Sequence, residues 1–269
     1  MHRNISINTL SLPPGDIASH AEMVARLGAR AISPDLVDII AATPARAAQA
    51  ITDAGLEVAT LTHRAFGFAT PDETREQRER LLQTLDIAAA LGAQSIIMTT
   101  GGRGCLTWPE AAARFAEAIA PCADRARQLG IPLGIEQTSH LYADASITHR
   151  LADGLAVARQ AGIAVMIDIF ACWVDSDIDQ AIAAAGPLCP LVQISDYVYG
   201  DRGLPCRAVP GDGAIPFARL IPAMVAAGIR GWYDLEIIGP RIAAEGHEAG
   251  LRRAAGHIGA LLEQAGLPA

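Results

Sequence analysis

Short runs rich in β-branched residues alternate along the chain with longer, alanine-rich stretches in which apolar residues recur at helical spacing. The short runs have the length and apolar character of buried strands, and the longer stretches have the pattern of amphipathic helices. Regular alternation of the two predicts repeated βα units around a parallel sheet. We count eight such units, and their strands are predicted at residues 4–10, 31–36, 57–63, 95–101, 132–138, 164–170, 191–197 and 232–238.

The ends of the predicted helices carry local signals that agree with this pattern. The stretch Thr70-Pro71-Asp72-Glu73 has a capping residue, a proline at the first helical position and a glutamate three residues after the cap. Several other helices end in a glycine just before the next strand, as in "RLGAR", "ALGAQS" and "QLGIPL". No linker divides the chain, and no GxGxxG motif follows the first strand. Eight units therefore predict one α/β domain over residues 1–269, a single (β/α)8 TIM barrel rather than an open dinucleotide-binding sheet.

Composition narrows the partners and the compartment that we expect. The net charge of −8 argues against a nucleic-acid partner, because duplex binding depends on clustered basic side chains. The N-terminus has no apolar signal segment, and no stretch reaches the roughly 20 apolar residues of a membrane span. We therefore expect no membrane partner and a cytoplasmic location. The five cysteines form no CxxC pair, which predicts reduced thiols rather than a disulfide framework.

One absence in the composition excludes a class of chemistry. All 21 basic residues are arginine, and the chain contains no lysine. Mechanisms that pass through a Schiff base need a lysine amine, so class I aldolase and pyridoxal-phosphate chemistry are excluded.

Four polar residues stand near the C-terminal ends of four consecutive, otherwise apolar strands. In a (β/α)8 barrel these ends form the active-site face. One buried carboxylate alone is more often a structural hydrogen-bonding residue, but three converging carboxylates repel each other unless a cation neutralises them. Three carboxylates and one amide oxygen form a hard ligand set that suits Mg²⁺ or Mn²⁺. The four residues are Glu136 in "GIEQT", Asp168 in "MIDIF", Gln193 in "LVQIS" and Glu236 in "YDLEI".

These motifs resemble the xylose isomerase-like TIM barrels, a superfamily of sugar phosphate isomerases and epimerases. It includes hydroxypyruvate isomerase, ketose 3-epimerases, inosose dehydratase and 3-dehydroshikimate dehydratase. The order of strands and helices resembles that of the family over the whole chain, and the specific motifs lie in residues 132–239. In that family a glutamate, an aspartate, a histidine or glutamine and a glutamate on strands 5 to 8 bind one divalent metal. The resemblance implies this role for Glu136, Asp168, Gln193 and Glu236, with Mn²⁺ or Mg²⁺ as the cofactor and Co²⁺ or Zn²⁺ as alternatives.

The loop after the seventh predicted strand also follows the family pattern, and the sixth strand departs from it. The family's arginine before a Pro-Gly-x-Gly turn appears in "CRAVPGDG", which implies that Arg207 contacts substrate. Many relatives carry a histidine three residues after the strand 6 aspartate, where this chain has Ala171. What that histidine does is then either absent or supplied by another residue, such as His63 or His140.

The chemistry expected of this site is proton transfer beside a carbonyl group. A divalent ion stabilises the enediolate, and Glu136 and Glu236 can take and return the proton. The expected activity is that of a metal-dependent isomerase or epimerase acting on a small polyhydroxy carbonyl compound in carbohydrate metabolism. A dehydratase or lyase on the same metal site is the alternative. A nuclease related to endonuclease IV and a non-catalytic sugar-binding barrel are further alternatives, although the acidic charge argues against a nuclease.

Several residues in loops near the predicted barrel mouth are candidates for substrate contact. A lone histidine at a strand end is as often structural, and scarce aromatic residues near this face suit either stacking on a sugar ring or covering the barrel. A homo-oligomer is compatible with the sequence. The candidates for substrate binding are Arg207, His63, His140, Tyr142, Trp173 and Trp108.

Overall fold

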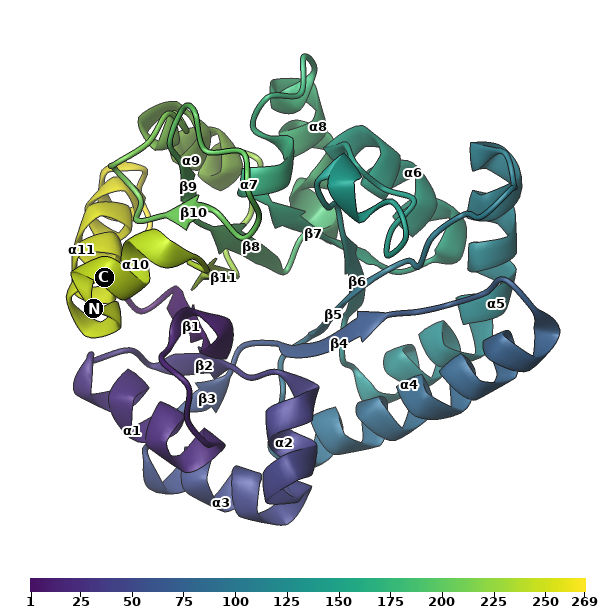
Figure 1. Cartoon of the computed structure of the whole chain (residues 1–269), viewed down its shortest axis with the longest axis horizontal. Helices are drawn as coiled ribbons and strands as arrows, with labels where there is room; N and C mark the ends of the chain where they lie inside the picture. The colour runs from purple at the N-terminus through teal and green to yellow at the C-terminus, as the bar shows by residue number, and fades with distance from the viewer.

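A computed structural model describes residues 1–269 and shows parallel strands around a central axis with helices outside them (Figure 1). The main sheet has nine strands in the order β3-β2-β1-β11-β8-β7-β6-β5-β4, and all of its pairings are parallel. Its strands are β1 (Ile5–Asn8), β2 (Ala31–Ser33), β3 (Glu57–Val58), β4 (Leu61–Ala65), β5 (Ile96–Thr99), β6 (Leu133–Glu136), β7 (Ala164–Asp168), β8 (Leu191–Ile194) and β11 (Trp232–Leu235).

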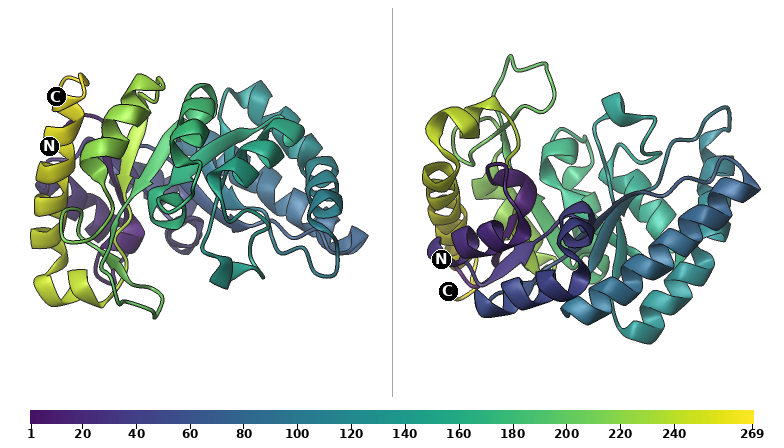
Figure 2. Two further views of the ribbon diagram at one scale, coloured as in Figure 1. Left: turned by 90° about the horizontal axis from the view of Figure 1, so that it is seen from above. Right: turned by 60° about the horizontal axis from the view of Figure 1, so that its bottom comes forward.

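The other elements cover the sheet or lie in the loops at its edges. The longer helices form the outer layer, and the two chain ends lie near each other beside α11 (Figure 2). The strands β9 (Asp196–Tyr197) and β10 (Arg207–Ala208) form a separate antiparallel pair. The helices are α1 (Ile17–Arg26), α2 (Leu36–Ala42), α3 (Pro44–Asp53), α4 (Pro71–Leu91), α5 (Trp108–Leu129), α6 (Leu151–Ala161), α7 (Ile169–Cys172), α8 (Ile178–Ala185), α9 (Phe217–Ala226), α10 (Pro240–Glu245), α11 (His247–Gln264) and the 3-10 turns η1 (Thr9–Ser11), η2 (His140–Tyr142) and η3 (Gly186–Leu188).

The eight predicted strands are all present, and the third is divided into β3 and β4. β3 pairs with β2, whereas β4 pairs with β5. The backbone N–H groups of Ala59 and Thr62 donate to the carbonyl oxygens of Ile32 and Pro34 at 3.0 and 3.1 Å. The chain between β3 and β4 and the start of β4 therefore remain hydrogen-bonded to β2 and the residues that follow it. The predicted (β/α)8 barrel is therefore confirmed. Its nine strand segments form eight strand positions, because β3 and β4 together occupy one of them.

The local signals at the helix ends act as the sequence predicts, except that Glu73 accepts from the backbone N–H of Ala69 and not from that of the capping residue. Thr70 accepts a hydrogen bond from the backbone N–H of Glu73, and Pro71 is the first residue of α4. The same helix ends at Gly92, whose φ of 66° lies in the left-handed region that glycine adopts without steric cost. No helix is long and apolar enough to cross a membrane.

The interior of the barrel changes from apolar to polar along its axis. A small cluster of buried apolar side chains comes from the strands and the segment that joins β3 to β4, and it is separate from the large core between sheet and helices. Buried polar side chains, including Ser6, Ser33 and Asp234, also stand on the strands. The members of the small cluster are Ala31, Ala59, Ile97, Met166, Leu191 and Trp232.

Candidate active site

Four polar side chains lie at the C-terminal ends of four neighbouring strands, and we call them the strand-end cluster. Glu136 and Asp168 are the last residues of β6 and β7, and Gln193 of β8 stands opposite Asp168 in the strand register. Glu236 directly follows β11. Because β6, β7, β8 and β11 are parallel neighbours, these ends meet at one edge of the barrel. The structure thus brings together the four residues for which the sequence predicts a metal site.

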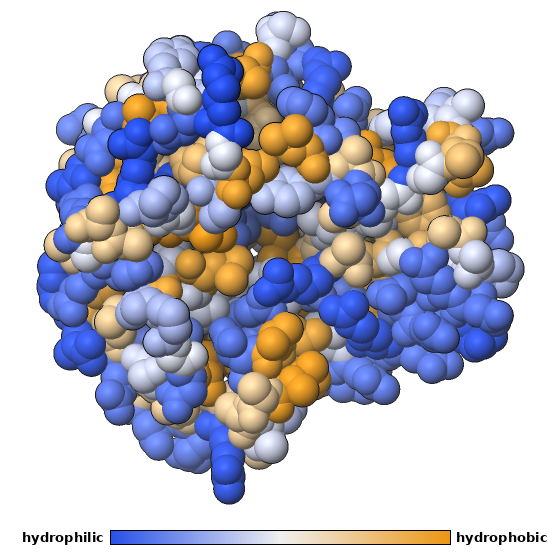
Figure 3. Space-filling view, in the orientation of Figure 1, coloured by the Kyte–Doolittle hydropathy of each residue, from blue (hydrophilic) through white to orange (hydrophobic).

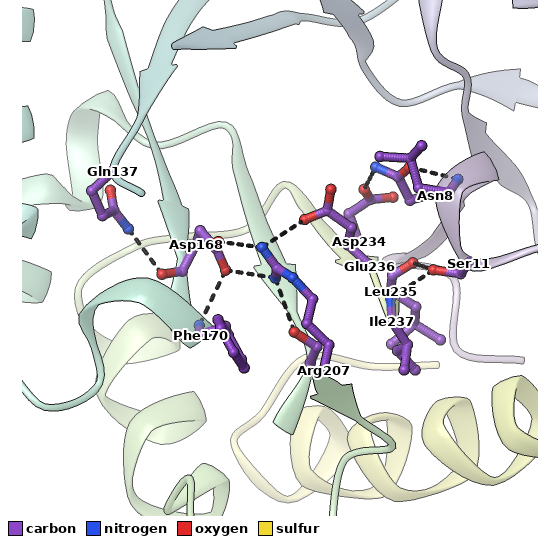
Figure 4. A network of polar contacts seen from close by, with 12 residues as sticks. Asn8, Ser11, Gln137, Asp168, Phe170, Arg207, Asp234, Leu235, Glu236 and Ile237 are labelled. Atoms are coloured by element: carbon purple, nitrogen blue, oxygen red, sulfur yellow. Dashed lines mark hydrogen bonds and ion pairs between the residues drawn. The ribbon is translucent and has the colours of Figure 1, made fainter. Parts of the chain in front are cut away.

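Arg207 enters the strand-end cluster from β10. Its backbone N–H donates to the Ile238 carbonyl oxygen at 3.0 Å, and β10 pairs with β9, so its main chain is held on both sides. Its guanidinium makes a two-point contact with Asp168, with Nη1 at 3.0 Å from Oδ1 and Nη2 at 2.6 Å from Oδ2. Nη2 also lies 3.3 Å from Oε2 of Glu236. Figure 4 shows the guanidinium between these two carboxylates.

Two further contacts orient the guanidinium of Arg207. Its Nη1 donates to the Ser195 hydroxyl oxygen at 2.9 Å, and its Cζ lies 4.8 Å from the centroid of the Phe170 ring, within reach of a cation–π contact. The side chain is only 16% exposed. Arg207 is therefore a residue of the site and not one half of a solvated surface pair.

Burial and the neighbouring charges raise the pKa values of both glutamates. Burial raises the pKa of Glu136 well above its usual value, and the charges of Glu236 and Asp168 add to this effect. Burial raises the pKa of Glu236 to about 7, Arg207 opposes this rise, and Asp168 and Asp234 contribute to it. Burial alone would lower the pKa of Arg207, but the charges of Asp168 and Glu236 raise it, so the guanidinium stays protonated. A carboxyl group with a pKa near neutrality is suited to exchanging protons.

The donor set of the strand-end cluster fits a divalent cation in charge and chemistry. Its three carboxylates carry −3 when ionised and Arg207 carries +1, which leaves −2. Oε1 of Gln193 is buried without a hydrogen-bond partner, and such an acceptor costs about 1–3 kcal/mol. Oxygen ligands of this kind suit Mg²⁺ or Mn²⁺. No group of three or more His, Cys, Asp and Glu side chains is arranged to hold a metal ion, and Asp168 instead directs both oxygens to Arg207.

Glu136, Asp168 and Glu236 line a cavity of about 400 Å³, and Gln193 does not. In the space-filling view, the face turned to the viewer is hollowed near its centre, with apolar and polar side chains around the hollow (Figure 3). A larger cavity of about 720 Å³ lies at the opposite ends of β6 and β7, and no carboxylate lines it. The smaller cavity is lined by Leu10, Thr62, Arg64, Ala65, Met98, Thr99, Glu136, Thr138, Ser139, Tyr142, Ala145, Asp168, Phe170, Leu204, Pro205, Arg207, Glu236 and Ile238.

His63 lies outside this cavity, which corrects the role that the sequence suggests for it. Its ring is fully buried and its Nδ1 lies 2.8 Å from the hydroxyl oxygen of Thr84 on α4. Successive side chains of a strand point to opposite faces, so Thr62 and Arg64 line the cavity while His63 faces the helix layer. Burial, with the charge of Arg80, lowers the pKa of His63 to about 3 and keeps the ring neutral.

The other candidates for substrate contact are divided between the cavity and its surroundings. Tyr142 lines the cavity, whereas His140, in the same 3-10 turn, is exposed and does not. Trp108 begins α5, and its indole N–H donates to the Ile147 carbonyl oxygen at 2.9 Å. Trp173 packs against Tyr197 with ring centroids 6.3 Å apart. Neither tryptophan lines the cavity.

Two charged residues of this region have no signal in the sequence pattern that we used. Arg64 has a positive φ of 79° at a register shift in β4, a conformation that costs roughly 1–2 kcal/mol for a residue with a Cβ, and its guanidinium pairs with buried Asp35. Asp234, two residues before Glu236, is fully buried. It accepts hydrogen bonds from Ser6 Oγ and Ser33 Oγ at 2.6 Å and from Asn8 Nδ2 at 3.0 Å. The two-residue spacing of Asp234 and Glu236 on one strand would have indicated that both face the barrel interior.

Comparison with known proteins gives one family match and many structural matches. The family model described as xylose isomerase-like TIM barrel matches residues 21–259. A protein from Sinorhizobium meliloti 1021 is 25% identical, with a TM-score of 0.83 over 97% of this chain and 98% of that one. D-psicose 3-epimerase from Clostridium cellulolyticum H10, solved with D-tagatose, is 16% identical, with a TM-score of 0.81 over 97% and 99%. The IOLI protein, solved with a zinc atom, is 13% identical, with a TM-score of 0.84 over 98% and 99%. No curated protein matches the chain.

Proposed function

The chain belongs to the xylose isomerase-like TIM barrel family, and from this premise we propose that it is a divalent-metal-dependent isomerase or epimerase of a small polyhydroxy carbonyl compound. The observation that carries the proposal is the strand-end cluster, in which three carboxyl groups and an amide oxygen converge around Arg207. The neighbours in fold include an epimerase of a ketose and a protein that binds zinc, which supports the proposal at the level of the family.

Glu136, Asp168, Gln193 and Glu236 are the residues that would hold the metal ion. A bound divalent cation would act as a Lewis acid toward the substrate carbonyl and stabilise the negative charge that develops on its oxygen. The all-oxygen donor set favours Mn²⁺ or Mg²⁺, and Zn²⁺ or Co²⁺ remain alternatives.

Glu136 and Glu236 have the position for acid–base work. They flank Asp168 and Gln193 along the sheet edge, because β7 and β8 lie between β6 and β11. Both line the cavity, and both have raised pKa values. One glutamate takes a proton from the carbon beside the carbonyl, and the other returns a proton to the opposite face or to the neighbouring carbon. General acid–base catalysis of this kind contributes roughly 10²–10⁴-fold to a rate.

The cavity sets the size and the polarity of the substrate. A volume of about 400 Å³ lies at the lower end of the range of about 300–1,000 Å³ for small-molecule pockets. Its lining includes the hydroxyl groups of Thr99, Thr138 and Ser139 and the apolar side chains of Met98 and Phe170. A polyhydroxy carbonyl compound would find both hydrogen-bond partners and apolar surface for its C–H groups.

A proton-exchange screen tests this function directly. Chelator-treated protein would receive Mg²⁺ or Mn²⁺ and be incubated in D₂O with ketoses, inososes and oxidised glycosides, and products would be followed by NMR after removal of the metal. We expect one substrate to lose the C–H signal beside its carbonyl only when metal is present. A product lighter by one water would identify the dehydratase alternative. Binding without any exchange or turnover would identify a non-catalytic sugar-binding barrel and refute the proposed enzyme.

A further inference from the structure

The contacts of Asp168 leave little of this carboxylate free for another cation. Oδ1 accepts hydrogen bonds from the backbone N–H of Phe170 at 3.1 Å and from Nη1 of Arg207 at 3.0 Å. Oδ2 accepts from Nη2 of Arg207 at 2.6 Å. A carboxylate offers about four lone-pair positions, so these three bonds use most of them. Asp168 is only 4% exposed. The positive charges of Arg207 and of a bound cation would therefore repel each other there with little screening by water.

We propose that Arg207 and a divalent cation compete for Asp168, so that metal binding moves the guanidinium off this carboxylate and into the cavity. This inference rests on the proposed metal-dependent function, and it concerns the affinity of the site for metal rather than the reaction. It assigns Arg207 a positioning role that precedes any contact with substrate.

The architecture permits this movement without a change in the main chain. The backbone of Arg207 is held by β9 and by the carbonyl oxygen of Ile238, whereas its guanidinium is held only by polar contacts with Asp168, Ser195 and Glu236 and by the face of Phe170. Arg207 itself lines the cavity, so a rotated side chain has space beside it. The released guanidinium would present its N–H donors to the substrate.

The geometry of the pair distinguishes competition from simple charge repulsion. A guanidinium spans both oxygens of a carboxylate, whereas an ammonium group contacts it as a point charge. Arg207→Met removes both the charge and the two-point contact, and Arg207→Lys keeps the charge alone. Arg64→Met is the control for a nearby charge, because Arg64 lines the same cavity and its charge acts on Glu236, but it pairs with Asp35 and makes no contact with Asp168.

The experiment measures Mn²⁺ affinity of the full-length chelator-treated protein by the EPR signal of the free ion. We expect Arg207→Met to tighten Mn²⁺ binding by about tenfold or more, within the usual range of coupling between sites. The Mn²⁺ affinity of Arg207→Lys should lie between those of wild type and Arg207→Met. Arg64→Met should change the affinity by no more than about threefold, because the charge that it removes is half exposed to solvent. Asp168→Asn should weaken binding in the wild-type and in the Arg207→Met background.

The outcomes separate this inference from the proposed function. Equal or weaker Mn²⁺ binding by Arg207→Met, or equal gains in Arg207→Met and Arg64→Met, would overturn the competition and leave the metal-dependent function intact. Failure of every variant to bind Mn²⁺, Mg²⁺ or Zn²⁺ would overturn both.

A second measurement follows the unaltered protein and uses a variant only to assign the signals. The protein would be labelled with ¹⁵N-arginine and titrated with Mg²⁺, and the side-chain N–H signals would be followed by NMR. The signals of Arg207, assigned through Arg207→Lys, should shift more than those of Arg64. Signals of Arg207 that stay unchanged at saturating Mg²⁺ would contradict the displacement.

Discussion

Replacement of Glu236 by glutamine should remove a pH-dependent loss of stability that the buried carboxyl group imposes on the chelator-treated protein. The pKa of Glu236 is about 7 in the fold against an ordinary value of 4.5. A folded-state pKa above the unfolded value means that the contribution of Glu236 to stability is greatest below pH 4.5, falls as the pH rises from 4.5 and is lost above about 7. At 1.36 kcal/mol per pKa unit, this shift corresponds to about 3 kcal/mol between pH 4.5 and 8.

The assay compares urea unfolding of wild type and Glu236→Gln, followed by circular dichroism, at several pH values with a chelator present. Glutamine has the shape of the protonated acid, so the two proteins should have similar stability at pH 4.5. At pH 8 Glu236→Gln should be the more stable by about 3 kcal/mol. Glu263→Gln, at an exposed position on α11, serves as the control and should stay within about 0.5 kcal/mol of wild type at each pH. A difference between wild type and Glu236→Gln that does not grow from pH 4.5 to pH 8 would refute the reasoning.

Three further expectations test other parts of the structure. Gln193→His should retain Mn²⁺ binding measured by EPR, because a neutral imidazole can replace the amide oxygen as a ligand, and loss of binding would remove Gln193 from the ligand set. His63→Ala should lower the free energy of unfolding by about 2–4 kcal/mol, because it leaves a cavity under α4, and kcat/KM should stay at the wild-type value. A loss of kcat/KM without a loss of stability would show that His63 acts in the site. Thr70→Ala should lower the free energy of unfolding by about 1 kcal/mol through loss of the α4 cap, and no change in unfolding would show that the cap is replaced by solvent.

The fold could be predicted from the sequence because its signals are local. Strand runs, capping residues and helix-ending glycines each depend on a few neighbouring positions, and their regular repetition leaves few architectures. The division of the third strand had no such signal, because it depends on pairing with two different neighbours, β2 for β3 and β5 for β4. Where a strand gives way to a helix also depends on side-chain capping. Strand β7 ends at Asp168, since this residue caps α7, whereas the apolar pattern continues to residue 170.

The location of the strand-end cluster could be predicted from the rule that parallel strands end at one face, but the ion pairs within it could not. Polar residues at the ends of apolar strands were sufficient to choose Glu136, Asp168, Gln193 and Glu236, because parallel strands end at one face. The contact of Arg207 with Asp168 joins β10 to β7 across 39 positions of the chain, and no local pattern encodes it. His63 was misplaced for a simpler reason, since the alternation of side chains along β4 turns it away from the cavity.

Solvent deuterium incorporation beside the substrate carbonyl tests the central claim of metal-dependent proton transfer by Glu136 and Glu236. The measurement would use metal-loaded wild type, Glu136→Gln, Glu236→Gln and the double variant, with the substrate found in the proton-exchange screen and metal content checked in each protein. An amide oxygen can still bind metal but cannot accept a proton, so each single variant should lose exchange by about 10²–10⁴-fold and the double variant should show none above background. Exchange at the wild-type rate in a metal-loaded double variant would contradict the account.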